Sequence, residues 1–99
     1  LDGYWDSSII RLIYNSQDQL IERQTLDKEG ELLQMGDSKI AVIKYTYDES
    51  GNLSSLTEYD ASENVLDIAR YSYLSNGQLE RCSYLNKSNE LDSEIYVPI

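Results

Sequence analysis

The sequence predicts an all-β protein, an antiparallel meander of about eight strands in one strongly coiled sheet or a closed barrel. Short runs of residues alternate between apolar and polar, which is the pattern of half-buried strands. Clusters of Asp, Asn, Ser and Gly separate these runs at nearly regular intervals. The only proline, Pro98, follows the last run, so no earlier strand is interrupted. The 99 residues (1–99) form a single domain.

The clearest unit is the segment 44–53, which has the pattern of a strand, a tight turn and the start of a second strand. Tyr45 and Tyr47 are two residues apart and therefore point to one face of the first strand. In the turn, an Asp side chain can bond the backbone two residues further on, and a Gly accepts positive φ. We expect a type I turn followed by a bulge. The structural turn residues of this unit and of a later copy are Asp48, Gly51, Asn52 and Gly77.

This hairpin unit recurs along the chain in degenerate form. Each copy has one apolar residue before the turn and a second one six positions later, preceded by a polar residue. Successive copies are separated by 12, 21, 12, 14 and 12 residues, and we expect a further turn at 36–38 inside the longest interval. If neighbouring strands pair, these anchor residues should share one face of the sheet. The anchor pairs are Tyr14/Leu20, Leu26/Leu32, Tyr47/Leu53, Tyr59/Val65, Tyr73/Leu79 and Leu85/Leu91.

The eight predicted strands follow from these turns. The first, 8–14, is apolar on both faces, and the second, 20–26, follows a turn rich in Asn, Ser and Gln. A helical turn over 18–24 also fits the local pattern. A short third strand is expected at 32–35, after a turn at 27–30. The remaining strands, each bounded by turn residues, are 39–47, 53–59, 65–73, 79–85 and 91–97.

The run Tyr-x-Tyr-Asp-x-x-Gly-Asn-Leu at 45–53 resembles the tyrosine-aspartate (YD, or Rhs-type) repeats of bacterial surface and secreted proteins. A second copy at 70–79 has Leu74 in place of the Asp, and the Tyr59-Asp60 copy lacks the Gly. The resemblance implies a β-hairpin array and an extracytoplasmic protein, either secreted, periplasmic or a surface lipoprotein. The family motif is structural, so it implies no functional residues.

Composition narrows the range of partners. The formal net charge of −10 disfavours nucleic acid and anionic membranes. No apolar run approaches the roughly 18 residues of a membrane span. Cys82 is the only cysteine, so an intrachain disulfide is impossible, and we expect it to act as a small buried hydrophobe. Because the chain begins at Leu1 without a Met, we expect a trimmed N-terminus, and the absence of a signal sequence is uninformative.

The residues favour a non-enzymatic protein without a cofactor or metal. The chain has no His, and no nucleophile or phosphate-loop motif is present. The acidic turns at 27–31 and 48–52 resemble the start of calcium loops, but the EF-hand spacing is absent. Two roles remain: a structural or assembly module, which we favour, and a module that binds a protein or glycan through a Tyr-rich sheet face. The speculative ligand-binding residues are Tyr45, Tyr47, Tyr71, Tyr73 and Trp5.

The two edges of the predicted sheet differ in charge. Strand 8–14 carries one charged residue, Arg11, whereas the last strand carries Asp92 and Glu94 and is followed by Pro98. Unpaired strands recruit other chains, and charges and proline protect against this. Three covers are open to the first strand: the last strand closing a barrel, Tyr4 and Trp5 folding back, or a second copy of the chain. We expect something other than the last strand, most simply the same strand of a symmetric homodimer.

Overall fold

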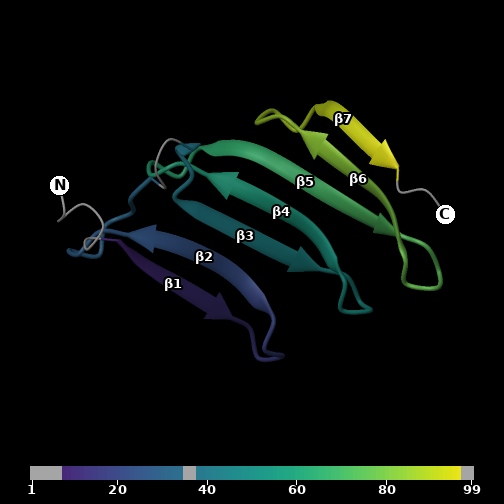
Figure 1. The fold of residues 1–99 in the computed structure, drawn as a ribbon, viewed down its shortest axis with the longest axis horizontal. Coiled ribbons are helices and arrows are strands. Elements are labelled where there is room, and N and C mark those ends of the chain that lie inside the picture. Colours follow the sequence, from purple (N-terminus) through teal and green to yellow (C-terminus); the bar gives the residue numbers. More distant parts are fainter. Residues whose placement is uncertain (1–7, 35–37, 97–99) are drawn as a thin grey trace.

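The computed structural model describes residues 8–34 and 38–96. Seven antiparallel strands form one sheet in the order β1-β2-β3-β4-β5-β6-β7, with β1 and β7 at its two edges (Figure 1). The all-β antiparallel meander is thus confirmed. The described residues form seven strands where about eight were expected, and their sheet is not closed into a barrel. Trp5 and most of the turn expected at 36–38 lie outside the described residues. The strands are β1 (Ile9–Tyr14), β2 (Leu20–Leu26), β3 (Val42–Tyr47), β4 (Leu53–Tyr59), β5 (Val65–Tyr73), β6 (Leu79–Leu85) and β7 (Leu91–Tyr96).

Over its described residues, 32–34, the strand expected at 32–35 does not form, because β3 occupies the edge of β2 that it would need. Leu32 makes only an isolated bridge with Leu26. The Leu33 N–H donates to the Thr25 carbonyl at 2.8 Å, while the Thr25 N–H donates to the Ala41 carbonyl at 2.9 Å. The chain therefore leaves the sheet after Leu33 and returns beside the same residue of β2. The described residues of the long interval between repeats therefore add no further strand to the sheet.

One turn geometry recurs at every hairpin. In the turn 48–52, the Asp48 N–H donates to the Asn52 carbonyl at 2.8 Å, and the Gly51 N–H donates to the Asp48 carbonyl at 3.0 Å. Gly51 has a φ of +89°, in the left-handed region that a bulge after a type I turn requires. The same pair of backbone bonds closes the turns 15–19, 27–31, 60–64, 74–78 and 86–90.

The two residues of each anchor pair are cross-strand neighbours. A second bulge lies next to each pair, on the side away from the turn. Tyr47 lies opposite Leu53, but the preceding Thr46 lies opposite Ser55, so the register shifts by one residue. The hydroxyl groups of Ser54 and Ser55 both bond to the Thr46 hydroxyl, at 2.9 and 2.6 Å. A shift at the equivalent position occurs in the β1/β2, β4/β5, β5/β6 and β6/β7 hairpins.

The anchors do not share one face, which corrects the sequence-based expectation. Directly opposed residues of paired strands share a face, and successive residues of a strand alternate. Tyr47 therefore lies on the face of Tyr45, as do Tyr14 and Tyr73, whereas Tyr59 lies on the face of Lys44. We call these the Tyr45 face and the Lys44 face. Successive turns lie at opposite ends of the sheet, and the anchors alternate between faces accordingly (Figure 1).

The sheet is a single layer with a thin core. Its buried apolar residues are Leu26, Ala41, Val42, Ala69, Cys82 and Leu85, and no large side chain is fully buried. All residues of β7 are exposed, as are most of those in β1. Among the described residues, no helix has the length and apolarity needed to cross a membrane.

Candidate functional site

The four tyrosines proposed as ligand contacts lie together on the Tyr45 face. Tyr45 and Tyr47 come from β3, and Tyr71 and Tyr73 come from β5, with β4 between them. All four side chains are half-buried. Two of them are already engaged, since the Tyr47 hydroxyl donates to the Leu20 carbonyl and the Tyr73 hydroxyl to the Leu53 carbonyl, both at 2.7 Å. Tyr47 thus joins the β3/β4 hairpin to β1/β2, and Tyr73 joins the β5/β6 hairpin to β3/β4.

A shallow hollow of about 470 Å³ lies beside Tyr71. Its floor is apolar and aromatic, and two carboxylates stand at one side. Glu58 of β4 lies directly opposite Asp67 of β5. Burial, together with the charge of Asp67, raises the pKa of Glu58 above its ordinary value. The lining residues are Leu56, Glu58, Asp67, Ile68, Ala69, Tyr71 and Tyr84.

Among residues 8–34 and 38–96, no lysine or arginine forms an ion pair with Glu58 or Asp67. Burial also raises the pKa of the Tyr71 hydroxyl, so Tyr71 stays neutral at physiological pH. The arrangement offers negative charge beside aromatic rings, and it could hold a positively charged group. It contains no nucleophile paired with a base.

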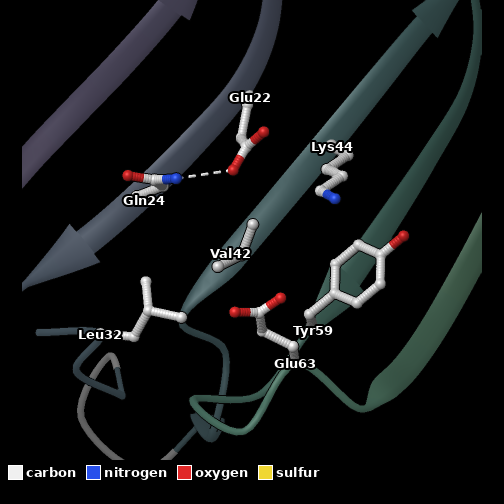
Figure 2. Close-up of a pocket in the computed structure, with 7 residues that line it drawn as sticks. All are labelled: Glu22, Gln24, Leu32, Val42, Lys44, Tyr59 and Glu63. Atoms are coloured by element: carbon white, nitrogen blue, oxygen red, sulfur yellow. Dashed lines mark hydrogen bonds between the residues drawn. The ribbon is translucent and has the colours of Figure 1, made fainter.

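A smaller hollow of about 170 Å³ lies on the Lys44 face, near the turn 60–64 (Figure 2). The Lys44 ammonium lies over the Tyr59 ring, with Nζ 5.1 Å from its centroid. Glu22 is the cross-strand neighbour of Lys44 and accepts a hydrogen bond from Gln24 Nε2 at 2.7 Å. Opposite charges already face each other here, so this hollow has less unmatched charge to offer a ligand. Leu32, Val42 and Glu63 complete its lining.

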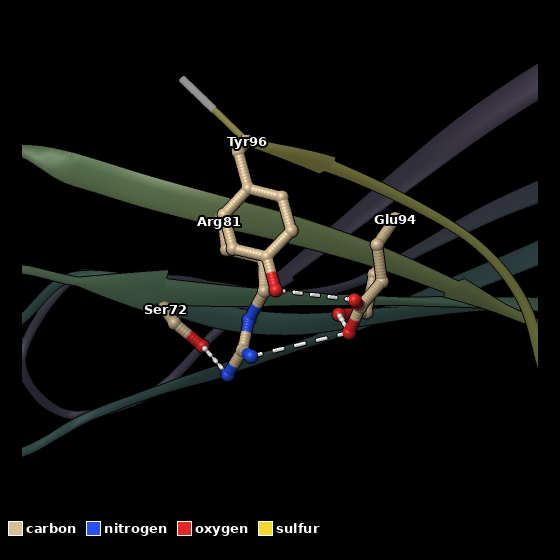
Figure 3. A network of polar contacts seen from close by, with 5 residues as sticks. Ser72, Arg81, Glu94 and Tyr96 are labelled. Atoms are coloured by element: carbon tan, nitrogen blue, oxygen red, sulfur yellow. Dashed lines mark hydrogen bonds and ion pairs between the residues drawn. The ribbon is translucent and has the colours of Figure 1, made fainter. Parts of the chain in front are cut away.

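A polar network ties β7 to the sheet on the Lys44 face (Figure 3). Arg81 Nη2 donates to the Ser72 hydroxyl at 3.2 Å, and Nη1 lies 3.9 Å from the Glu94 carboxylate. The Tyr96 hydroxyl donates to the same carboxylate at 3.3 Å, and so does the Ser83 hydroxyl at 3.2 Å. The network spans β5, β6 and β7, and it engages both terminal nitrogens of Arg81, while the buried Arg81 Nε has no hydrogen-bond partner among the described residues. We interpret it as a structural clamp on an otherwise exposed strand.

The acidic turns use their oxygen atoms for the backbone. Asp48 Oδ1 accepts the N–H groups of Ser50 and Asn52, each at 2.9 Å. Asp27 Oδ1 accepts the two equivalent N–H groups in the turn 27–31, also at 2.9 Å. Gly77, with a φ of +91°, occupies the position of Gly51 in the turn 74–78. In the described part of the chain, no three residues of the metal-binding types gather closely enough to hold an ion.

Comparison of the chain with protein-family models, curated proteins and solved structures gave no significant match. Cys82 is buried and unpaired, between Tyr71 and Ile95 on neighbouring strands. On the Tyr45 face, Cys82 packs as a small buried hydrophobic residue, as free cysteines often do.

Sequence reasoning missed the carboxylate pair and Tyr84 of the larger hollow. Glu58 and Asp67 are nine positions apart, and their juxtaposition depends on the bulge that shifts Tyr59 against Val65. Regular alternation on both sides of that turn would give a different pairing. The repeat alignment could have helped to find the pair, because it identifies Tyr59 and Val65 as opposed residues. The register of β4 against β5 can be counted from them.

Proposed function

We propose that this chain is a non-enzymatic extracytoplasmic repeat module with a structural or assembly role in a bacterial surface or secreted protein. One observation carries this proposal. Tyr47 and Tyr73 occupy equivalent positions in two hairpins at the same end of the sheet. Each hydroxyl donates to the anchor leucine carbonyl of the preceding hairpin at that end. The tyrosines of the repeat thus act as ties between repeats, which is the role of a structural motif.

The remaining geometry supports the same role. The second bulge recurs at every hairpin that joins two strands, and bulges increase the local right-handed twist. Repeated at each hairpin, they favour a strongly coiled sheet. The open edges at β1 and β7 are suited to continuation by further strands. The extracytoplasmic location and the assignment to YD repeats rest on the motif at 45–53.

Replacement of the tie tyrosines tests the structural role. Tyr47→Phe and Tyr73→Phe each remove one part-buried hydrogen bond, so each should lower the free energy of unfolding by about 1 kcal/mol. Tyr45→Phe is the matched control, since the Tyr45 hydroxyl forms no hydrogen bond within the described residues. Urea unfolding of the three variants measures the difference. Equal stability of all three would remove the main support for the proposal.

The location is tested separately. The full-length gene product should become accessible to protease added to intact bacteria, or should appear in the periplasmic or culture fraction. Immunoblotting of fractionated cells with an antibody to this chain provides the measurement. Recovery in the cytoplasmic fraction alone would contradict the extracytoplasmic assignment and leave the structural role to be judged from the tyrosine variants.

The hollow beside Tyr71 favours a second candidate function, binding of a peptide through the Tyr-rich face, with a glycan as the alternative ligand. The unmatched Glu58/Asp67 pair next to Tyr71 and Tyr84 suits a lysine or arginine side chain. NMR titration with a lysine-containing peptide should shift the amide signals of β4 and β5, and Tyr84→Ala should reduce the shifts. Shifts with neutral oligosaccharides would indicate the glycan alternative, and no shifts with either would reject the candidate.

A further inference from the structure

The outer edge of β1 is an apolar strand whose outward-pointing backbone groups bond to no other described residue. Three of its residues lie on the Tyr45 face, where the exposed fractions of Ile10, Leu12 and Tyr14 are 48, 46 and 53%. The N–H and C=O groups of Asn15 both bond across the turn to residues 18–19. Because these groups alternate in direction along a strand, those of Ile10, Leu12 and Tyr14 point away from β2. The edge therefore presents hydrogen-bonding groups and apolar side chains together.

The number of strands restricts how a second copy could extend the sheet. With seven antiparallel strands, β1 and β7 run in the same direction. A translated copy would therefore pair its β7 with β1 in parallel, which is the less stable arrangement. Antiparallel pairing with both faces kept on the same sides requires a two-fold axis, which joins β1 to β1 or β7 to β7. A flipped copy would instead join the Tyr45 face to the Lys44 face.

The distribution of charge favours β1 over β7 as the edge that pairs with a second copy. β7 carries Asp92 and Glu94, and a two-fold axis beside it would bring these acidic residues close to their own copies. β1 carries only Arg11, which already donates to Gln24 Oε1 at 3.3 Å. Because each chain has a net charge of −10, the edge with no acidic residue is where two copies repel least.

The side chains also select a register. A two-fold axis beside Arg11 would oppose the two guanidinium groups. An axis beside Leu12 places Leu12 opposite Leu12 of the second copy, and Ile10 opposite Tyr14. Arg11 then faces Ile13 on the other face. This register uses the outward-pointing backbone groups and makes one continuous apolar row on the Tyr45 face.

We propose that β1 is a homodimerisation edge, at which two copies of this chain pair antiparallel about a two-fold axis beside Leu12 to form one continuous sheet. The partner in the assembly role proposed above is then a second copy of this chain, and the inference rests on that proposed role. Main-chain hydrogen bonds supply the affinity, and the Ile10, Leu12 and Tyr14 row supplies the register. Salt should strengthen the dimer, because it screens the repulsion between two chains of charge −10.

Sedimentation velocity over a concentration series, at low and high NaCl, tests the dimer. We expect dimerisation that increases with concentration and with salt. Leu12→Lys should raise the dissociation constant by at least about tenfold, since it opposes two lysines at the axis. Ile95→Lys is the matched control. Ile95 is in β7, on the Tyr45 face like Leu12, and its exposed fraction of 55% is comparable. It should leave dimerisation unchanged. Ile10→Lys provides a second β1 variant if Leu12→Lys alters folding.

The register has its own test. Oxidised Leu12→Cys should form a disulfide-linked dimer in solution, while oxidised Ile95→Cys should not, and the wild-type chain with its buried Cys82 should stay unlinked. Amide exchange at Ile10 and Leu12 should slow only where the dimer is populated. A monomer at about 1 mM in high salt, dissociation by Ile95→Lys alone, or slow exchange at these amides in the monomer would each overturn the proposal. None of these results bears on the Tyr47→Phe experiment, so the two proposals fail separately.

Discussion

Glu58 and Asp67 lie directly opposite each other on β4 and β5, two like charges beside a half-buried aromatic hollow. Cross-strand pairs of like charge destabilise a sheet, and burial adds to the cost of ionising Glu58. The pKa of Glu58 is raised above its ordinary value of 4.5 for these two reasons, burial being the larger. Among the described residues, no lysine or arginine forms an ion pair with either carboxylate, so the pair leaves negative charge unmatched on this face.

Glu58→Gln should therefore stabilise the protein at neutral pH, by roughly 0.2–1 kcal/mol. A carboxyl group with a raised pKa in the folded state favours folding below its unfolded pKa of 4.5, and this advantage is lost as pH rises through the folded pKa. The stability gap between variant and wild type should therefore open above pH 4.5 and close below it. Urea unfolding at a series of pH values measures this gap.

The control for Glu58→Gln is Glu49→Gln, in an exposed turn. It removes the same formal charge from the chain of net charge −10 without relieving a cross-strand pair. A gain in stability of equal size for both variants would assign the effect to overall charge and contradict the role of the pair.

Gly51→Val should destabilise the fold by about 1–3 kcal/mol, because a β-branched residue at a φ of +89° is strained. Crowding does not contribute, since a Cβ at this position would meet only the Gln19 amide nitrogen, at an ordinary 3.9 Å. Thermal unfolding followed by circular dichroism measures the loss.

Glu63 occupies the position of Gly51 in the turn 60–64, and its replacement should change stability in the opposite direction. Glu63 has a φ of +67°, so Glu63→Gly should relieve strain and raise stability by up to about 1 kcal/mol. A loss of stability in Glu63→Gly would contradict the backbone strain assigned to Glu63.

Asp60 predicts a second effect of pH, opposite in sign to that of Glu58. Hydrogen bonds from the backbone of Asn64, its side chain and the backbone of Ser62 hold the pKa of Asp60 below its ordinary value of 3.8. The resulting stability is present above pH 3.8 and is lost as pH falls through the folded pKa.

Asp60→Asn should abolish this loss in acid while keeping the turn. Asn15 and Asn86 hold the same turn in this protein through Oδ1 bonds to two backbone N–H groups. The difference in unfolding free energy between Asp60→Asn and wild type, measured between pH 2 and pH 5, should change in the variant's favour as the solution becomes more acidic. An unchanged difference over this range would contradict the pKa assignment.

The turns could be predicted from the sequence because their chemistry is local. A side-chain acceptor at the first position and a residue that tolerates positive φ at the fourth lie within one five-residue window, as in Asp48 and Gly51. The anchor pairs followed for the same reason, since each lies immediately outside its turn. The sequence therefore predicted the antiparallel meander and most of its strand positions.

The faces of the sheet, the number of strands and the larger hollow could not be predicted in the same way. Ser54 and its equivalents insert one residue beside each anchor, which changes which residues share a face, and no local pattern marks that insertion. The strand expected at 32–35 was wrong because β3, ten residues further on, competes for the same backbone groups of β2.

The sequence by itself determined the hairpin unit, its turn residues and the antiparallel order, because these depend on backbone preferences over a few residues. Only the tertiary structure decided which side chains meet across strands, including the Glu58/Asp67 pair and the hydroxyl bond from Tyr47 to Leu20. These contacts join residues 9 and 27 positions apart, and they depend on register summed over bulges and on competition between strands for one edge.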